Sequence, residues 1–271
     1  MTVRTEKNGP LWTIVHSRFQ EARNAMDPES ADQLVEHLLA FDRDPEAKVA
    51  VLWGEGGAFC AGWDLKYASA LADRAKFDED IVRGLAFPMG SNAAPRGPLG
   101  PTRLELSKPV IAAVEGPAVA GGMELALWCD IRVMADTGYF GVYCRRWGIP
   151  LLDGGSVRLP RLVGQGRAME IILTGRKVEA EEALRIGMCE KVVPTGGARA
   201  AAEAMAHEIA RFPQAAVRAD RRTVHESYGL PLRDAMRVEW HNGVEAHHAE
   251  GADGAARFAS GLGRSGDFSR I

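Results

Sequence analysis

The sequence has few cysteines and no strong charge of either sign. Its four cysteines, Cys60, Cys129, Cys144 and Cys189, are scattered through 271 residues without a C-x-x-C pair. This pattern disfavours a disulfide framework and favours reduced thiols in a cytosolic protein. Lys and Arg number 33 against 36 Asp and Glu, for a formal net charge of −3. Nucleic acid is therefore not expected as the main partner.

Long apolar runs are also absent. No stretch is long enough to cross a bilayer, and residues 1–7 lack the apolar segment of a signal peptide. We therefore expect a cytoplasmic protein without a membrane partner. With 46% apolar and 25% charged residues, the chain has the composition of a globular protein with a sizeable core. Its length fits one large domain or two small ones.

Strand and helix signals alternate along the first part of the chain. Apolar runs predict strands at 11–16, 49–54 and 131–135 and a buried strand at 108–115. Asp27 before Pro28 predicts the start of a helix that reaches about Phe41. Asp64 is expected to cap another helix that begins at residues 63–65. Two units of strand, glycine-rich loop and helix predict a parallel α/β arrangement. From Gly166 the pattern is mainly helical, with helices expected at 167–173, 180–186, 197–211, 215–227, 231–250 and 251–268.

The most distinctive stretch runs from Gly116 to Asp130. Residues 121–128 predict a helix that is apolar on nearly every side, hence buried, yet it carries the carboxyl group of Glu124. Such a group needs partners when buried. In the first turn it lies near free N–H groups, and Gly121 on the same face leaves its own N–H unshielded. Two interpretations are open: Glu124 satisfies helix-start donors, or it borders a small functional pocket.

The two glycine-rich loops suggest a chemistry. The turn Ala61-Gly62-Trp63 and the residue Gly121 each direct free backbone N–H groups toward a common point. Two converging donors are what an oxyanion on a thioester carbonyl requires, and Glu124 on the same face is placed to move a proton at the adjacent carbon. The layout favours chemistry through a thioester enolate.

Other motifs carry less information. The loop at 54–59 has Phe59 at the sixth position of the dinucleotide fingerprint, and residues 154–157 lack the G-x-S-x-G elbow of serine hydrolases. His241, Glu245 and His248 have metal-ligand spacing on one helical face, but without a fourth ligand a solvated face is favoured and no metal is expected.

Two loop segments leave alternatives open. The Pro- and Gly-rich segment 88–101 is either a lid over a binding site or a disordered excursion. The pair Arg145-Arg146 favours a surface or interface position, with a phosphate contact as the alternative.

Taken together, several stretches resemble the crotonase (enoyl-CoA hydratase/isomerase) family. The matching residues are 21–26, 58–65, 108–116, 120–126, 129–132, 140–141, 257–258 and 263–268, and they follow the family's order over nearly the whole chain. The resemblance implies an α/β fold, a spiral of ββα turns over residues 1–195 that carries an acyl-CoA site. It implies a helical C-terminal region, 196–271, for trimerisation and active-site cover. It further implies trimers or dimers of trimers, and no cofactor beyond the coenzyme A of the substrate.

The resemblance also implies roles for individual residues. The backbone N–H groups of Trp63 and Gly121 match the oxyanion donors, and Glu124 matches the first catalytic glutamate of hydratases. The positions that match the path of coenzyme A and its pantetheine arm are Ala22, Arg23, Ala61, Asp64 and Leu65.

The chain departs from the hydratase pattern at the second acid. Cys144 stands where hydratases carry another glutamate, and the next acid is Asp153, which matches an aspartate of dienoyl-CoA isomerases. Asp153 either serves as a second catalytic acid or caps the turn at Gly154-Gly155. The expected function is that of an enoyl-CoA hydratase, a lyase. The alternative is a double-bond isomerase, and a non-catalytic acyl-CoA-binding or RNA-binding relative is a further one.

Overall fold

The computed structural model describes residues 1–87 and 95–263, and its core contains a six-stranded sheet. The strand order is β1-β2-β3-β4-β6-β9. Strand β1 pairs antiparallel with β2, while the other neighbours are parallel. The predicted parallel α/β arrangement is thus confirmed, with one antiparallel edge strand that was not foreseen. The strands are β1 (Val3–Asn8), β2 (Leu11–His16), β3 (Val49–Gly54), β4 (Val110–Val114), β6 (Ile131–Ala135) and β9 (Lys191–Val193).

A second, three-stranded sheet lies beside the first one. It has the order β5-β7-β8, with strands β5 (Pro117–Val119), β7 (Tyr139–Gly141) and β8 (Lys177–Glu179). Consecutive strands belong to different sheets, because β4 is followed by β5 and β6 is followed by β7. In each of these two strand pairs the chain passes from the six-stranded sheet to the three-stranded sheet. This arrangement confirms the expected spiral of ββα turns.

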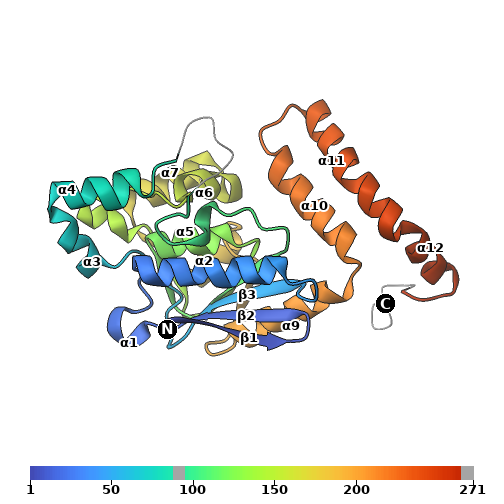
Figure 1. The fold of residues 1–271 in the computed structure, drawn as a ribbon, viewed down its shortest axis with the longest axis horizontal. Helices are drawn as coiled ribbons and strands as arrows, with labels where there is room; N and C mark the ends of the chain where they lie inside the picture. The colour runs from blue at the N-terminus through green and yellow to red at the C-terminus, as the bar shows by residue number, and fades with distance from the viewer. Residues whose placement is uncertain (88–94, 264–271) are drawn as a thin grey trace.

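Helices cover both faces of the large sheet (Figure 1). Helix α2 (Pro28–Arg43) begins where predicted, since the Asp27 carboxylate accepts the N–H of Ser30 at 2.8 Å. On the other face, small residues of α9 (Ala198–Arg211) pack on β3, β4 and β6. The remaining helices are α1 (Phe19–Ala22), α3 (Leu65–Ser69), α4 (Arg74–Phe77), α5 (Gly121–Trp128), α6 (Gly155–Val163), α7 (Gln165–Thr174), α8 (Ala180–Arg185), α10 (Gln214–Ser227), α11 (Leu232–Ala246) and α12 (Ala252–Ala259).

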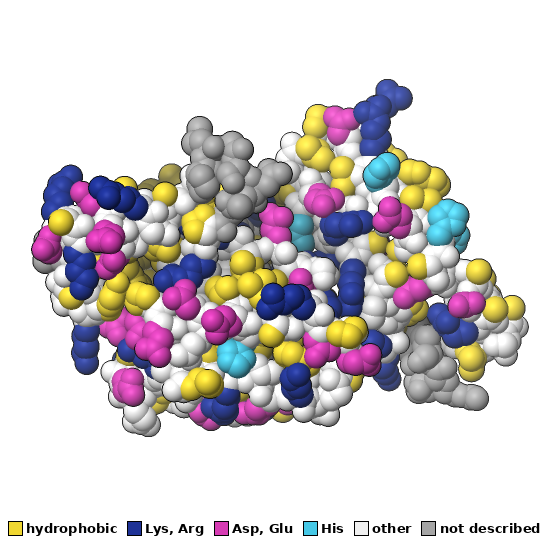
Figure 2. Space-filling model, in the orientation of Figure 1, with side chains coloured by type: hydrophobic (Ala, Val, Ile, Leu, Met, Phe, Trp, Pro, Cys, Tyr) yellow, Lys and Arg dark blue, Asp and Glu magenta, His cyan; other side chains and the backbone are white. Residues whose placement is uncertain are grey.

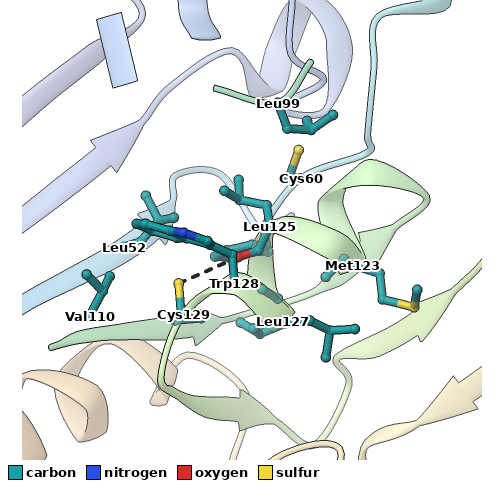
Figure 3. Close-up of a cluster of buried hydrophobic side chains, with 14 of the residues drawn as sticks. Leu52, Cys60, Leu99, Val110, Met123, Leu125, Leu127, Trp128 and Cys129 are labelled. Carbon is teal, nitrogen blue, oxygen red and sulfur yellow. Dashed lines mark hydrogen bonds between the residues drawn. The ribbon is translucent and has the colours of Figure 1, made fainter. Parts of the chain in front are cut away.

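Helix α5 lies inside the molecule, and all eight of its residues are buried. Figure 3 shows Leu125 and Trp128 of α5 packed near Leu52 of β3, with the thiol of Cys129 donating to the Leu125 carbonyl at 3.6 Å. A helix without a solvent-facing side needs apolar residues all round, which explains the sequence of this segment.

The C-terminal helices α10, α11 and α12 stand beside the α/β core (Figure 1). Arg221 joins α10 to the α/β core. Its Nε lies 2.9 Å from both carboxylate oxygens of Asp130, and its Nη1 donates to the Leu106 carbonyl at 2.5 Å. The helix predicted at 231–250 ends at Ala246, where a π-helical turn, His247–Gly251, leads into α12. The end of the helix predicted at 251–268 lies outside the described residues. Within the described residues, no helix is both long and apolar enough to cross a membrane.

Candidate active site

A cavity of about 90 Å³ opens at the N-terminal end of α5. Its lining is mainly apolar and aromatic, with the carboxyl groups of Glu124 and Asp153 among the polar groups. The residues predicted for the site that line this cavity are Ala61, Trp63, Leu65, Gly121, Glu124, Cys144 and Asp153. Ala22, Arg23 and Asp64 are not part of its wall.

Glu124 is 2% exposed and is held by main-chain donors from another segment. Its Oε1 accepts the N–H of Asp153 at 2.9 Å and the N–H of Gly155 at 2.7 Å. The interpretation that Glu124 satisfies donors of its own helix is therefore wrong. Burial, and secondarily the charge of Asp153, raises the pKa of Glu124 to about 8. At neutral pH this carboxyl group is mostly protonated.

The first residue of α6, Gly155, allows that contact. A Cβ placed on Gly155 would lie 2.8 Å from Glu124 Cγ and 3.0 Å from Oε1. The side chain of any other residue at position 155 would push the Glu124 carboxyl group away from the N–H group that donates to it. The glycine predicted as part of a turn is thus also a packing requirement of the site.

Asp153 is 3% exposed and is the second buried acid of the cavity. Its Oδ1 accepts the N–H of Leu99 at 3.0 Å and the hydroxyl of Thr102. Burial raises the pKa of Asp153, while these two hydrogen bonds favour the ionised form and oppose the rise. The alternative that Asp153 caps the turn at Gly154-Gly155 is wrong, because the Gly155 N–H donates to Glu124 instead.

The turn that carries Trp63 is fixed by a parallel bridge to Met26. The Met26 N–H donates to the Gly62 carbonyl at 2.7 Å, and the Asp64 N–H donates to the Met26 carbonyl at 2.9 Å. In such a bridge the residue between the two bonds directs its own N–H to the opposite side. Trp63 therefore presents its N–H away from Met26.

The Gly62 turn and the start of α5 touch one another. A Cβ on Gly62 would lie 3.1 Å from Gly121 N and 3.0 Å from Ala120 Cβ. Ala120 has a φ of 52° and a ψ of −125°, unfavourable for a residue with a side chain. Its N–H is bonded to the Gly141 carbonyl at 2.7 Å, and α5 starts at the next residue, Gly121, whose N–H lacks an acceptor within the helix. Both predicted donor residues are thus brought to one cavity.

Cys144 lies in the 3₁₀ turn Tyr143–Trp147 and is 6% exposed. Burial, and secondarily the charge of Glu124, raises the pKa of its thiol. The side chain is therefore a neutral thiol that helps to line the cavity, and it supplies no acid there.

The residues predicted along the coenzyme A path divide into two groups. Ala61 and Leu65 line the cavity, whereas Asp64 is buried, caps α3 through Lys66 N at 2.9 Å and pairs with Arg18 at 3.0 Å. Ala22 ends α1, and the exposed Arg23 follows it with a φ of 51°. These two residues lie a few positions before Met26, which the bridge to Trp63 joins to the cavity wall.

Sequence reasoning missed three residues of the site: Leu99, Thr102 and Arg158. Arg158 donates to the carbonyls of Asp153 at 2.9 Å and Thr102 at 2.8 Å. The contacts of Leu99 and Thr102 with Asp153, and of Arg158 with Thr102, span more than fifty positions in the chain and leave no local pattern. In the segment 88–101, for which a lid and a disordered excursion were the alternatives, Gly97 and Gly100 exchange two backbone hydrogen bonds. Residues 88–94 lie outside the described residues.

The side chains of the remaining candidate motifs are not part of the cavity lining. In the described part of the chain, no group of three or more His, Cys, Asp and Glu side chains could hold a metal ion. The guanidinium of Arg146 lies 4.1 Å from the ring centroid of Tyr143. Acidic and basic side chains are interspersed on the face seen in Figure 2, as the small net charge leads one to expect.

Comparisons with known proteins show the family of this chain. The family model for enoyl-CoA hydratase/isomerase matches residues 13–86 and 101–260. The chain is 33% identical to an enoyl-CoA hydratase of Mycobacterium tuberculosis, over 94% of this chain and 92% of that protein. It is 34% identical to a carnitinyl-CoA dehydratase of Citrobacter koseri, over 85% and 83% of the two chains. A crystal structure of enoyl-CoA hydratase from Mycobacterium tuberculosis superposes with a TM-score of 0.83, at 33% identity over 96% of each chain.

Proposed function

Because this chain belongs to the enoyl-CoA hydratase/isomerase family, we propose that it adds water reversibly to the C2–C3 double bond of a 2-enoyl-CoA. One observation carries the proposal. Two buried carboxyl groups, Glu124 and Asp153, share one cavity with the donor residues Trp63 and Gly121. Relatives named enoyl-CoA hydratase and carnitinyl-CoA dehydratase support a lyase of this type.

The two N–H groups would bind the thioester carbonyl oxygen. As a hydroxyl group bonds to C3, the electron pair of the double bond moves toward C2 and negative charge collects on that oxygen. Donors already held in place, by the Met26 bridge at Trp63 and by the helix start at Gly121, need no rearrangement to stabilise the charge.

The two acids would divide the proton transfers between them. Asp153, whose ionised form accepts two hydrogen bonds, takes a proton from the attacking water. Glu124, protonated at neutral pH, gives its proton to C2. The hydroxyl on C3 and the hydrogen on C2 together make up one water, and a proton passing from Asp153 back to Glu124 restores the starting state. Coenzyme A enters only as part of the substrate.

Incubation of the protein with crotonyl-CoA in H₂¹⁸O tests this proposal. The expected product is 3-hydroxybutyryl-CoA that carries one ¹⁸O at C3. A catalyst that shifts the double bond of 3-butenoyl-CoA but incorporates no ¹⁸O would contradict hydration. That outcome would favour the isomerase alternative, which the presence of Cys144 at the position of the second hydratase glutamate supports, since a proton shuttle needs only one carboxylate.

We further propose a homo-oligomer, a trimer or a dimer of trimers, with residues 196–271 as its assembly region. Large apolar side chains on this region are exposed, among them Val224, Leu232, Met236 and Trp240. Light scattering should give three or six times the chain mass. The cytoplasm is the proposed location, because all four cysteines are buried and free.

A further inference from the structure

Leu99 closes the cavity over the start of α5. The side chain is 1% exposed and lines the cavity. A Cβ placed on Gly121 would lie 2.4 Å from Leu99 Cδ2, so the leucine packs directly on the backbone of Gly121. Figure 3 shows Leu99 reaching toward Cys60 and α5 from the segment above them. A bound acyl chain that passes Gly121 would therefore meet Leu99.

Leu99 is held in this position by its neighbours. Its N–H donates to Asp153 Oδ1 at 3.0 Å, and the same oxygen accepts the hydroxyl of Thr102. The tight turn around Leu99 is closed by Gly97 N to Gly100 O at 2.8 Å and Gly100 N to Gly97 O at 2.9 Å. The segment is thus a fixed wall, tied through a carboxylate to the loop that also binds Glu124.

We propose that Leu99 limits the length of the acyl chain that the cavity accepts, and that Thr102 is a positioning residue that keeps it there. The proposal rests on the proposed function, because it assumes an acyl-CoA ligand. A leucine side chain has three more carbon atoms than that of alanine. Replacing Leu99 with alanine would therefore open room, beside Gly121, for about three further methylene groups of a ligand.

Binding of saturated thioesters tests the wall without requiring turnover. The dissociation constants of butyryl-CoA and heptanoyl-CoA, which differ by three methylene groups, would be measured by calorimetry. Leu99→Ala should shift the ratio of the two constants about tenfold toward heptanoyl-CoA relative to wild type. Leu34→Ala removes the same atoms from a fully buried leucine that is not in the cavity wall, and it should leave the ratio unchanged.

The outcomes separate this inference from the proposed function. Equal ratios of the two dissociation constants in the wild type, Leu99→Ala and Leu34→Ala would overturn the proposal that Leu99 limits chain length. A wild type that binds neither thioester would also overturn it. If Leu99→Ala shifts the ratio of dissociation constants but the protein does not hydrate crotonyl-CoA, the role of Leu99 is supported and only the hydratase proposal is overturned.

Thr102 is tested by a pair of variants. Thr102→Val removes the hydroxyl bonded to Asp153 while keeping the size of the side chain, and it should move the binding ratio in the same direction, about threefold. Thr102→Ser keeps the hydroxyl and should restore the wild-type ratio. A valine variant with the wild-type ratio would show that Thr102 does not position Leu99.

Discussion

The main-chain N–H of Asp153 donates a 2.9 Å hydrogen bond to Oε1 of Glu124, so two buried acids are fixed to each other through one backbone atom. The Glu124 carboxyl group is thereby held against the backbone of Asp153, and both side chains are almost fully buried. Both pKa values are raised, chiefly by burial.

The pH dependence of stability should carry the signature of Glu124. Its pKa rises from 4.5 to about 8 on folding, so between these values the folded protein binds more protons than the unfolded chain. Stability should therefore fall as the pH rises from 4.5 through 8, by a few kcal/mol for this group. Urea unfolding of the wild type and of Glu124→Gln across this pH range measures how the free energy of unfolding changes. The difference in the free energy of unfolding between the two proteins should become small and constant below pH 4.5. If this free energy changes with pH in the same way in both proteins, the raised pKa of Glu124 is contradicted.

Asp153→Asn separates a catalytic acid from a structural one. Asparagine can still accept the N–H of Leu99 and the hydroxyl of Thr102 through its Oδ1, so the wall of the cavity should persist. The variant cannot take a proton from water, and kcat for crotonyl-CoA hydration should fall on the order of 10²-fold. Wild-type rates in steady-state assays would reduce Asp153 to an anchor for residues 99–102.

Gly155→Ala should damage both stability and activity. The added methyl group would lie 2.8 Å from Glu124 Cγ, and overpacking of this kind typically destabilises by about 1–3 kcal/mol. Gly166→Ala is the matched control, because a Cβ at this helical position meets no atom within 4 Å; it should be neutral or stabilising. Equal unfolding free energies for the two variants would argue against the close contact at Gly155.

The attachment of the C-terminal helices should depend on Arg221. Removing its guanidinium leaves the largely buried Asp130 with His225 as its remaining side-chain partner, and Arg221→Ala should lower the unfolding free energy by about 3 kcal/mol. Arg237→Ala breaks an exposed pair with Asp234 and should change it by less than about 1 kcal/mol. A similar small change in both would mean that the Asp130 pair does not secure α10.

Local signals and longer-range contacts differ in what the sequence reveals. Asp27 and Asp64 cap their helices as predicted, because a cap involves residues only two or three positions apart. The buried α5 was predicted from its uniform apolar character. Strand β1 was missed, since Arg4 and Glu6 interrupt its pattern with half-exposed charges.

The partners of the two acids could not be predicted from the sequence. One of the two interpretations placed Glu124 beside donors of its own helix, but the donors come from residues 153 and 155. One of the two alternatives for Asp153 was a cap on its own turn, yet its side chain binds Leu99 and Thr102. Nothing in the composition of either segment specifies which distant amide will meet a carboxylate, because the fold alone brings them together. The family resemblance supplied the candidate residues without these contacts.

The central claim, that Glu124 moves the proton while backbone donors bind the thioester, is tested most directly by one variant. Glu124→Gln keeps the size of the side chain and an oxygen that can accept from Asp153 and Gly155, but it cannot transfer a proton. Turnover of crotonyl-CoA should fall at least about 10³-fold, while the dissociation constant of butyryl-CoA stays within about threefold of wild type. Full turnover in this variant would contradict the account.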